Sequence, residues 1–330
     1  MRKAVLGLLI ATCLGSGARA QQPGVDPYIW LEDVSSPRAM SWVEQHNAVT
    51  TGKLEADPRY ATLYAQALEI AGAEDRIPTP SFSHGQIYNF WQDPEHLRGI
   101  MRRTTLADYR NPNPNWITVL DIDALNKAEG KSWVMRGFDC LRPDGRLCLV
   151  SLSNGGEDAV EVRMRGDTIT EPHAVALRME MSTASQSAFV SGGFHLPRDK
   201  HRVAWEDADH LLLATEWTPG DLTPSGYPYI VKRLVRGMPL ASAVEVYRGA
   251  KTDGGYGVST EVLHDGQSNR LTVIERPLDT FRHQTYVVTA RGTERLAIPD
   301  KASVAGLVAG RVIVKLDEAW PGAGAGDKSF

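Results

Sequence analysis

FDCLRPDGRLCLVSLSNGGEDAVEV, residues 138–162, has the pattern of short strands joined by tight turns. Apolar runs flank Pro143-Asp144-Gly145, in which Gly145 can supply the positive φ that closes a three-residue hairpin loop with a bulge. A second turn, Ser153-Asn154-Gly155-Gly156, follows Leu152, and β-branched residues then resume up to Val162. The stretch therefore predicts a hairpin followed by a third strand.

Ser153 has the appearance of a hydrolase nucleophile, because glycines follow it closely. In an α/β-hydrolase that serine requires a helix directly after it, since the helix N-terminus and the next N–H build the oxyanion site. Charged and then β-branched residues follow here, Ser151 stands where the first glycine of G-x-S-x-G belongs, and the motif occurs nowhere in the 330 residues. We interpret Ser153 as a turn residue and assign no catalytic residue.

The N-terminus has the features of a secretory signal. Met1-Arg2-Lys3 precedes an apolar run from Ala4 to Leu14, and Ala18-Arg19-Ala20 predicts cleavage after Ala20. The run is too short to span a bilayer, so we expect a periplasmic or secreted protein with no membrane span. Cleavage removes three cations and takes the net charge from −4 to −7, which leaves no electrostatic basis for binding nucleic acid.

Cys140 and Cys148 lie opposite each other if Pro143-Asp144-Gly145 forms the loop. An oxidising compartment favours a disulfide between them. The loop-closure entropy of such a bond predicts that it stabilises the folded state by about 2 to 3 kcal/mol. Paired strands often have an unfavourable geometry for such a link, so two buried free thiols are the alternative.

Two helices are predicted before residue 77, which with a linker make up an N-terminal segment of residues 21–76. Ser36 as N-cap and Pro37 at the first helical position start one helix, and Asp57-Pro58 starts the other. Apolar residues of the second helix recur at the spacing of a helix that packs on a core, at Tyr60, Leu63, Tyr64, Ala67, Leu68 and Ala71.

From Ile77 onward the apolar period is that of strands. The predicted strands are Ile87–Gln92, Arg98–Thr104, Trp116–Leu120, Trp133–Phe138, Leu147–Leu152, Ala159–Val162, Val203–Trp205, Leu211–Thr215, Tyr229–Leu234, Val244–Tyr247, Val258–Leu263, Leu271–Glu275, Thr285–Thr289 and Arg311–Leu316. No amphipathic helix of three turns interrupts them, which excludes a parallel β-α-β core. Groups of about four strands per 45 to 50 residues favour propeller blades over a sandwich.

Several motifs resemble the prolyl oligopeptidase family of serine peptidases. DPYIWLED at 26–33 and WVEQHN at 42–47 resemble the start of that family. Later segments resemble the N-terminal region of bacterial members: DRIP at 75–78, YNFWQD at 88–93, RRTTL at 102–106, CLVSLS at 148–153 and SGYP at 225–228. The ordered set runs through nearly all of the mature chain.

The resemblance implies a seven-bladed β-propeller and a C-terminal α/β-hydrolase domain with a Ser-Asp-His triad. In the family the propeller restricts entry to short peptides. The sequence ends at Phe330, so we expect residues 77–330 to hold about four to five blades, without the catalytic domain. We expect this chain to be inactive alone, to need no cofactor, and to self-associate through an open propeller edge. Met164 to Leu177 resembles an insertion in a blade strand.

Two other functions are alternatives. A self-sufficient periplasmic binding propeller would be favoured by a complete set of blades and a closing strand pair. A metal-dependent propeller hydrolase would need His, Asp and Glu converging at the inner strand ends. Neither His195 with His201 nor Glu206 with His210 has the helical spacing or third ligand of a zinc site, so we expect no metal.

Overall fold

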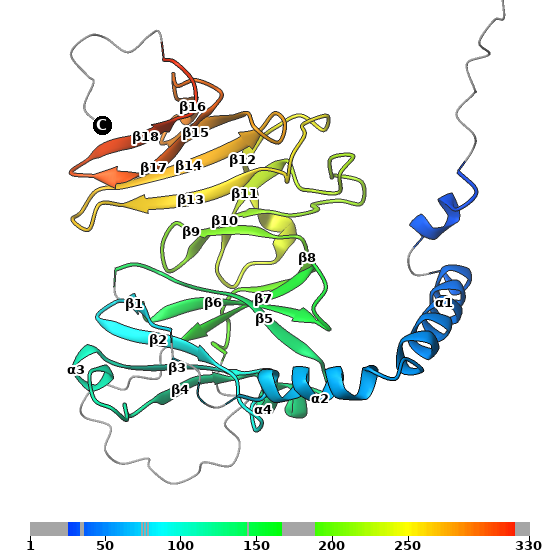
Figure 1. Ribbon diagram of the computed structural model, residues 1–330. Coiled ribbons are helices and arrows are strands. Elements are labelled where there is room, and N and C mark those ends of the chain that lie inside the picture. The colour runs from blue at the N-terminus through cyan, green and yellow to red at the C-terminus, as the bar shows by residue number, and fades with distance from the viewer. Residues whose placement is uncertain are drawn as a thin grey trace, which may run out of the picture. The chain divides into compact units, whose positions relative to one another are not determined.

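The computed structural model (Figure 1) describes residues 26–320 except 34–35, 74, 76, 78, 144 and 167–188. The chain divides into two compact units, Met1–Ala71 and Gly72–Phe330. The described part of the first unit is helical, and the second consists mainly of antiparallel sheets. The predicted signal lies outside the described residues.

The helical unit contains the 3-10 helix η1 (Ile29–Glu32) and the helices α1 (Pro37–Glu55) and α2 (Tyr60–Ala71). The Ser36 hydroxyl accepts a hydrogen bond of 3.2 Å from the Ala39 N–H, which confirms the predicted N-cap. No helix in the described part of the chain combines the length and the apolar character needed to cross a membrane.

Helix α2 begins at Tyr60, slightly later than predicted, because Asp57 first forms a turn. The Asp57 carboxylate accepts the Arg59 N–H at 2.9 Å, and its carbonyl accepts the Tyr60 N–H. None of the residues of α2 is buried, and Leu63 is 58% exposed. Core packing of this helix, expected from its period, is therefore not seen among the described residues.

The described part of the second unit contains four four-stranded antiparallel sheets and one two-stranded sheet, each built from consecutive strands (Figure 1). The strands are β1 (Ser81–Ser83), β2 (Gln86–Trp91), β3 (Ile100–Thr105) and β4 (Ile117–Asp121); β5 (Trp133–Cys140), β6 (Leu147–Asn154), β7 (Val160–Gly166) and β8 (His195–Asp199); β9 (Arg202–Trp205), β10 (His210–Ala214), β11 (Ile230–Val235) and β12 (Val244–Arg248); β13 (Ser259–His264), β14 (Arg270–Pro277), β15 (His283–Thr289) and β16 (Gly292–Arg295); and β17 (Ala302–Val308) and β18 (Arg311–Leu316). This is the arrangement of propeller blades, and the prediction of four to five blades is confirmed.

The apolar core lies between successive sheets. Leu149 and Leu196 of the second sheet pack with Trp205 and Leu211 of the third. Val231 of the third sheet packs in turn with residues of the fourth. Each blade therefore buries its apolar face against its neighbour, as in a propeller.

Short helices also occur within the second unit: α3 (Leu106–Tyr109), α4 (Ile122–Glu129) and η2 (Leu240–Ser242). The prediction did not include α4. The Asp121 carboxylate caps it by accepting the Ala124 N–H at 2.8 Å, and Gly130 ends it with a φ of 61°. Ile122 and Leu125 are buried, so this two-turn helix is held by the core.

Around the second sheet, one local prediction was wrong and the start of another was misplaced. The connection between β5 and β6 runs from Leu141 to Arg146 and is longer than three residues, although Gly145 has the predicted positive φ, of 66°. Met164 does not begin an insertion, because it lies in β7 and is fully buried in the core. Residues 167–177 lie outside the described residues.

Candidate functional site

The end of β5 lies between other sheets of the propeller and borders two cavities. One, of about 220 Å³, is lined by Asp139–Arg142 together with parts of β9 and β13. The other, of about 270 Å³, is lined by the end of β5 together with Ser81–His84 and parts of β2 and β3. We call Asp139 to Arg142, with His84 and Trp205, the β5-end site.

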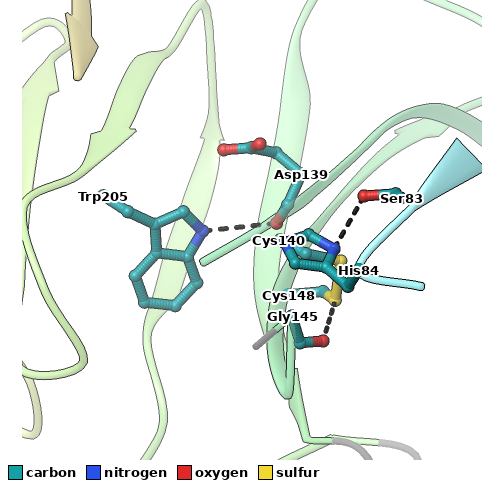
Figure 2. The surroundings of a disulfide bond; sticks show 7 residues. All are labelled: Ser83, His84, Asp139, Cys140, Gly145, Cys148 and Trp205. Carbon is teal, nitrogen blue, oxygen red and sulfur yellow. Dashed lines mark hydrogen bonds between the residues drawn. A yellow bond between two sulfur atoms is a disulfide. The ribbon is translucent and has the colours of Figure 1, made fainter. Parts of the chain in front are cut away.

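A disulfide closes the hairpin at this site. Cys140 and Cys148 are directly opposed in the register of β5 and β6, and their sulfur atoms are bonded (Figure 2). Their Cα atoms lie 3.9 Å apart. Of the two alternatives from the sequence, the structure has the disulfide rather than free thiols.

His84, from the turn between β1 and β2, lies against the hairpin (Figure 2). A Cβ on Gly145 would lie 2.5 Å from Cγ of the His84 ring, which is closer than atoms approach without a shift. The Ser83 hydroxyl oxygen is 2.7 Å from His84 Nδ1. Glycine at position 145 therefore serves both the turn and the contact between two sheets.

Asp139 connects the site to the third sheet. Its main-chain carbonyl accepts a hydrogen bond of 3.2 Å from Trp205 Nε1 (Figure 2). Asp139 as a whole residue is exposed to solvent. It lines both cavities, however, and the protein atoms around it replace part of the water that would surround its carboxylate. This desolvation raises the pKa of Asp139 above its usual range, although the charges of Arg142 and His84 act in the opposite direction.

The β5-end site has a Ser83–His84 hydrogen bond, but Asp139 does not complete it to a catalytic triad. In a triad, a carboxylate orients the histidine that takes the serine proton. Figure 2 shows the Asp139 carboxylate turned away from His84, and it accepts no hydrogen bond from any residue that the structure describes. The arrangement places polar side chains and main-chain groups along the walls of both cavities.

Ser153 has a structural contact. It is fully buried at the end of β6, and its hydroxyl donates a hydrogen bond of 2.7 Å to the Glu157 carbonyl. The hydroxyl thus fixes the turn that leads to β7. This contact agrees with the interpretation of Ser153 as a turn residue.

The histidines considered as metal ligands lie apart and have other partners. His195 Nε2 is 2.7 Å from the Glu161 carboxylate, His201 Nε2 contacts the Pro197 carbonyl, and His210 Nδ1 is 2.8 Å from Asp207. The Glu206 carboxylate is bound by Arg233. In the described ranges, no three His, Cys, Asp or Glu residues are grouped to hold a metal ion.

Known proteins similar to this chain are peptidases. The family profile described as prolyl oligopeptidase, N-terminal β-propeller domain, matches residues 18–291. The uncharacterized peptidase y4nA of Sinorhizobium fredii (strain NBRC 101917 / NGR234) is 41% identical over 323 residues, which cover 95% of this chain and 42% of the relative. An uncharacterized peptidase of Rickettsia prowazekii (strain Madrid E) is 25% identical over 283 residues, which cover 84% and 38%.

A solved structure of a post-proline cleaving enzyme from Rickettsia typhi has the same fold. It aligns with a TM-score of 0.71 at 23% identity and covers 83% of this chain and 39% of that enzyme. The chain spans about two fifths of the length of the curated relatives that it matches. From the profile match and the blades, the chain belongs to the prolyl oligopeptidase family and contains its N-terminal β-propeller domain.

Proposed function

We propose that this chain is the propeller-bearing part of a prolyl oligopeptidase-type serine peptidase. In the proposal, the propeller admits short peptides to a Ser-Asp-His site carried by a C-terminal α/β-hydrolase domain outside these 330 residues. The propeller sorts substrates by size and polarity, and the hydrolase domain performs the acyl transfer.

The family match carries the proposal, and the β5-end site supports it. Inner strands β5, β9 and β13 border a polar cavity at their ends, where a peptide would meet Asp139, Arg142 and His264. The Ser153 hydroxyl is engaged by a main-chain carbonyl, that of Glu157, at 2.7 Å. In this proposal, the blades recognise the peptide and take no part in the covalent chemistry.

A chimera tests the proposal. This chain is joined to the part of the S. fredii peptidase that follows the aligned region, and hydrolysis of proline-containing chromogenic peptides is measured. We expect cleavage after proline by the chimera and by the intact relative, and none by the isolated chain. Cleavage by the isolated chain, or an inactive chimera beside an active relative, would contradict the proposal.

We also propose that the protein is exported with cleavage after Ala20. The Cys140–Cys148 disulfide supports this, because such bonds persist in oxidising compartments. N-terminal sequencing of the protein from a secretion-competent host should begin at Gln21. An intact Met1 in the cytoplasmic fraction would overturn the proposed location.

A further inference from the structure

A different cavity, of about 310 Å³, lies where the second and third sheets meet, and cationic side chains dominate its wall. Arg136 of β5 lines it together with Lys200 and Arg202 at the start of β9. Asp158 is the single carboxylate among the described residues that line it. We call Arg136, Lys200 and Arg202 the basic cradle.

The cations of the basic cradle are not paired with carboxylates among the described residues. None of its three cations forms an ion pair with a carboxylate in the part of the chain that the structure describes. By contrast, Arg163 and Arg276 contact carboxylate oxygens at 2.6 Å. An excess of unpaired positive charge in a concave site attracts an anion.

The local backbone places Arg136 at this wall. Met135 pairs with Leu152 and Gly137 pairs with Ser151, so Arg136 is the extra residue of a β-bulge. A bulge changes the direction of a side chain and commonly occurs next to functional sites. The position of Arg136 is therefore set by the main chain of an inner strand.

Lys200 and Arg202 both lie near the Tyr227 ring, and Arg202 Nη2 also donates a hydrogen bond of 3.4 Å to the Tyr256 carbonyl. Lys200 Nζ is 4.6 Å and Arg202 Cζ is 5.9 Å from the centre of the Tyr227 ring. Cations over an aromatic face are favourably placed and lose less freedom when a ligand binds. Tyr227 also lines the cavity, so the ring and both cations belong to one wall.

The turn that carries these cations is itself fixed. Asp199 accepts the Lys200 N–H at 2.6 Å and the Glu216 N–H at 2.9 Å, and it also accepts the Thr215 hydroxyl. These bonds turn the Asp199 carboxylate to the interior of the sheet. Within the described residues, the Asp199 carboxylate forms no ion pair with the three cations of the basic cradle.

His201 is a further residue of this wall, and one of its ring nitrogens is buried. It lines the cavity, is only 9% exposed, and its Nδ1 has no hydrogen-bond partner in the described residues. Its Nε2 contacts the Pro197 carbonyl, which makes Nε2 the protonated nitrogen and Nδ1 an acceptor.

We propose that the basic cradle is an anion site that binds a carboxylate of the peptide substrate. That the ligand is a peptide rests on the proposed function, whereas the charge excess stands independently of it. The carboxylate belongs either to the peptide C-terminus or to an acidic side chain, and both present the same two oxygens to a guanidinium.

Fluorescence anisotropy of dansylated peptides with the purified chain tests the proposal. Dansyl-Gly-Pro-Ala with a free C-terminus and dansyl-Glu-Pro-Ala-amide are each compared with the neutral dansyl-Gly-Pro-Ala-amide. At least one acid should bind about tenfold tighter than the neutral peptide, since a charge-assisted hydrogen bond contributes about that factor. Which acid is preferred identifies the source of the carboxylate.

Variants separate the cradle from a general charge effect. Arg136→Gln and Arg202→Gln should abolish the preference for acid, whereas Arg136→Lys should retain part of it. Arg291→Gln is the matched control, because Arg291 is exposed in the turn between β15 and β16 and its removal changes the net charge equally. Thermal melts confirm that each variant is folded.

Two results would overturn the cradle: equal affinity of the wild-type chain for acid and neutral peptides, or equal losses in Arg291→Gln and Arg136→Gln. The chimera assay reads the proposed function separately. If the chain prefers acidic peptides but the chimera does not cleave after proline, the proposed peptidase role is rejected and the anion site is retained. If the chimera cleaves after proline but the chain binds acidic and neutral peptides equally, only the anion site is rejected.

Discussion

Cys140 and Cys148 face each other on adjacent antiparallel strands, and their disulfide closes the hairpin that borders both cavities of the β5-end site. The same hairpin holds Arg142 and Gly145, which lie next to His84 of the first sheet. One covalent bond thus supports residues from several blades.

The disulfide should stabilise the propeller. Loop closure over a sequence separation of eight residues predicts about 2.5 kcal/mol from a less disordered unfolded state. Urea unfolding of the oxidised protein should therefore show a higher midpoint than that of the Cys140→Ser, Cys148→Ser double variant. Alkylation of both cysteines in the folded, unreduced protein would contradict the bond.

Gly145→Ala should destabilise the protein more than Gly155→Ala. Both glycines have a positive φ, of 66° and 76°, so both variants have a backbone cost of about 1 to 2 kcal/mol. Only at Gly145 would the new Cβ also meet the His84 ring, whereas nothing lies within 4 Å at Gly155. Chemical denaturation measures the difference, and His84→Ala should reduce it. Equal losses would mean that His84 does not pack on the hairpin.

Arg276→Met should cost about 3 to 5 kcal/mol of folding free energy, because it leaves a buried carboxylate unpaired. Arg276 donates two hydrogen bonds, of 2.8 and 2.6 Å, to Asp253, which is only 8% exposed. Arg282→Met, which breaks an exposed pair with Asp279, is the control and should cost under about 1 kcal/mol. Similar losses in the two variants would argue against burial of the Asp253–Arg276 pair.

Stability should fall as the pH drops below about 6.5. Burial lowers the pKa of His201, against the effects of the Pro197 carbonyl and Asp199, so the unfolded chain takes up the proton first. A depressed folded pKa gives stability that is present above the unfolded pKa and is lost as pH falls, by up to about 1.4 kcal/mol per pH unit.

The measurement is the free energy of unfolding between pH 5.5 and 7.5. His201→Gln should flatten the pH dependence even if it lowers stability overall. An unchanged slope in His201→Gln would contradict the assignment of a buried, neutral imidazole.

Most strands could be predicted because they have apolar runs that face neighbouring blades, as Leu211 to Leu213 do. Strands β1, β8, β16 and β17 were missed. The side chains of β1 and β16 are mostly exposed, β8 is interrupted by Pro197, and β17 contains Gly306, so their sequences lack the period of a half-buried strand. Pairing with neighbours makes these segments strands.

The sites depend on contacts that a single sequence does not contain. His84, Asp139 and Trp205 come from three different sheets, and no motif links them. Arg136 enters the basic cradle through a bulge, which only the pairing register reveals. The sequence signals that did apply were local: Gly145 for the turn, and the two cysteines for the disulfide.

Labelling of serines by a fluorophosphonate, mapped by mass spectrometry, tests the central claim most directly. The reagent requires an activated serine, and the claim is that the propeller handles peptides while another domain supplies the nucleophile. We predict no labelled serine in the isolated chain, and in the chimera a single labelled serine within the segment from the S. fredii peptidase. A label on Ser83 or Ser153 that is lost in the corresponding alanine variant would contradict the account.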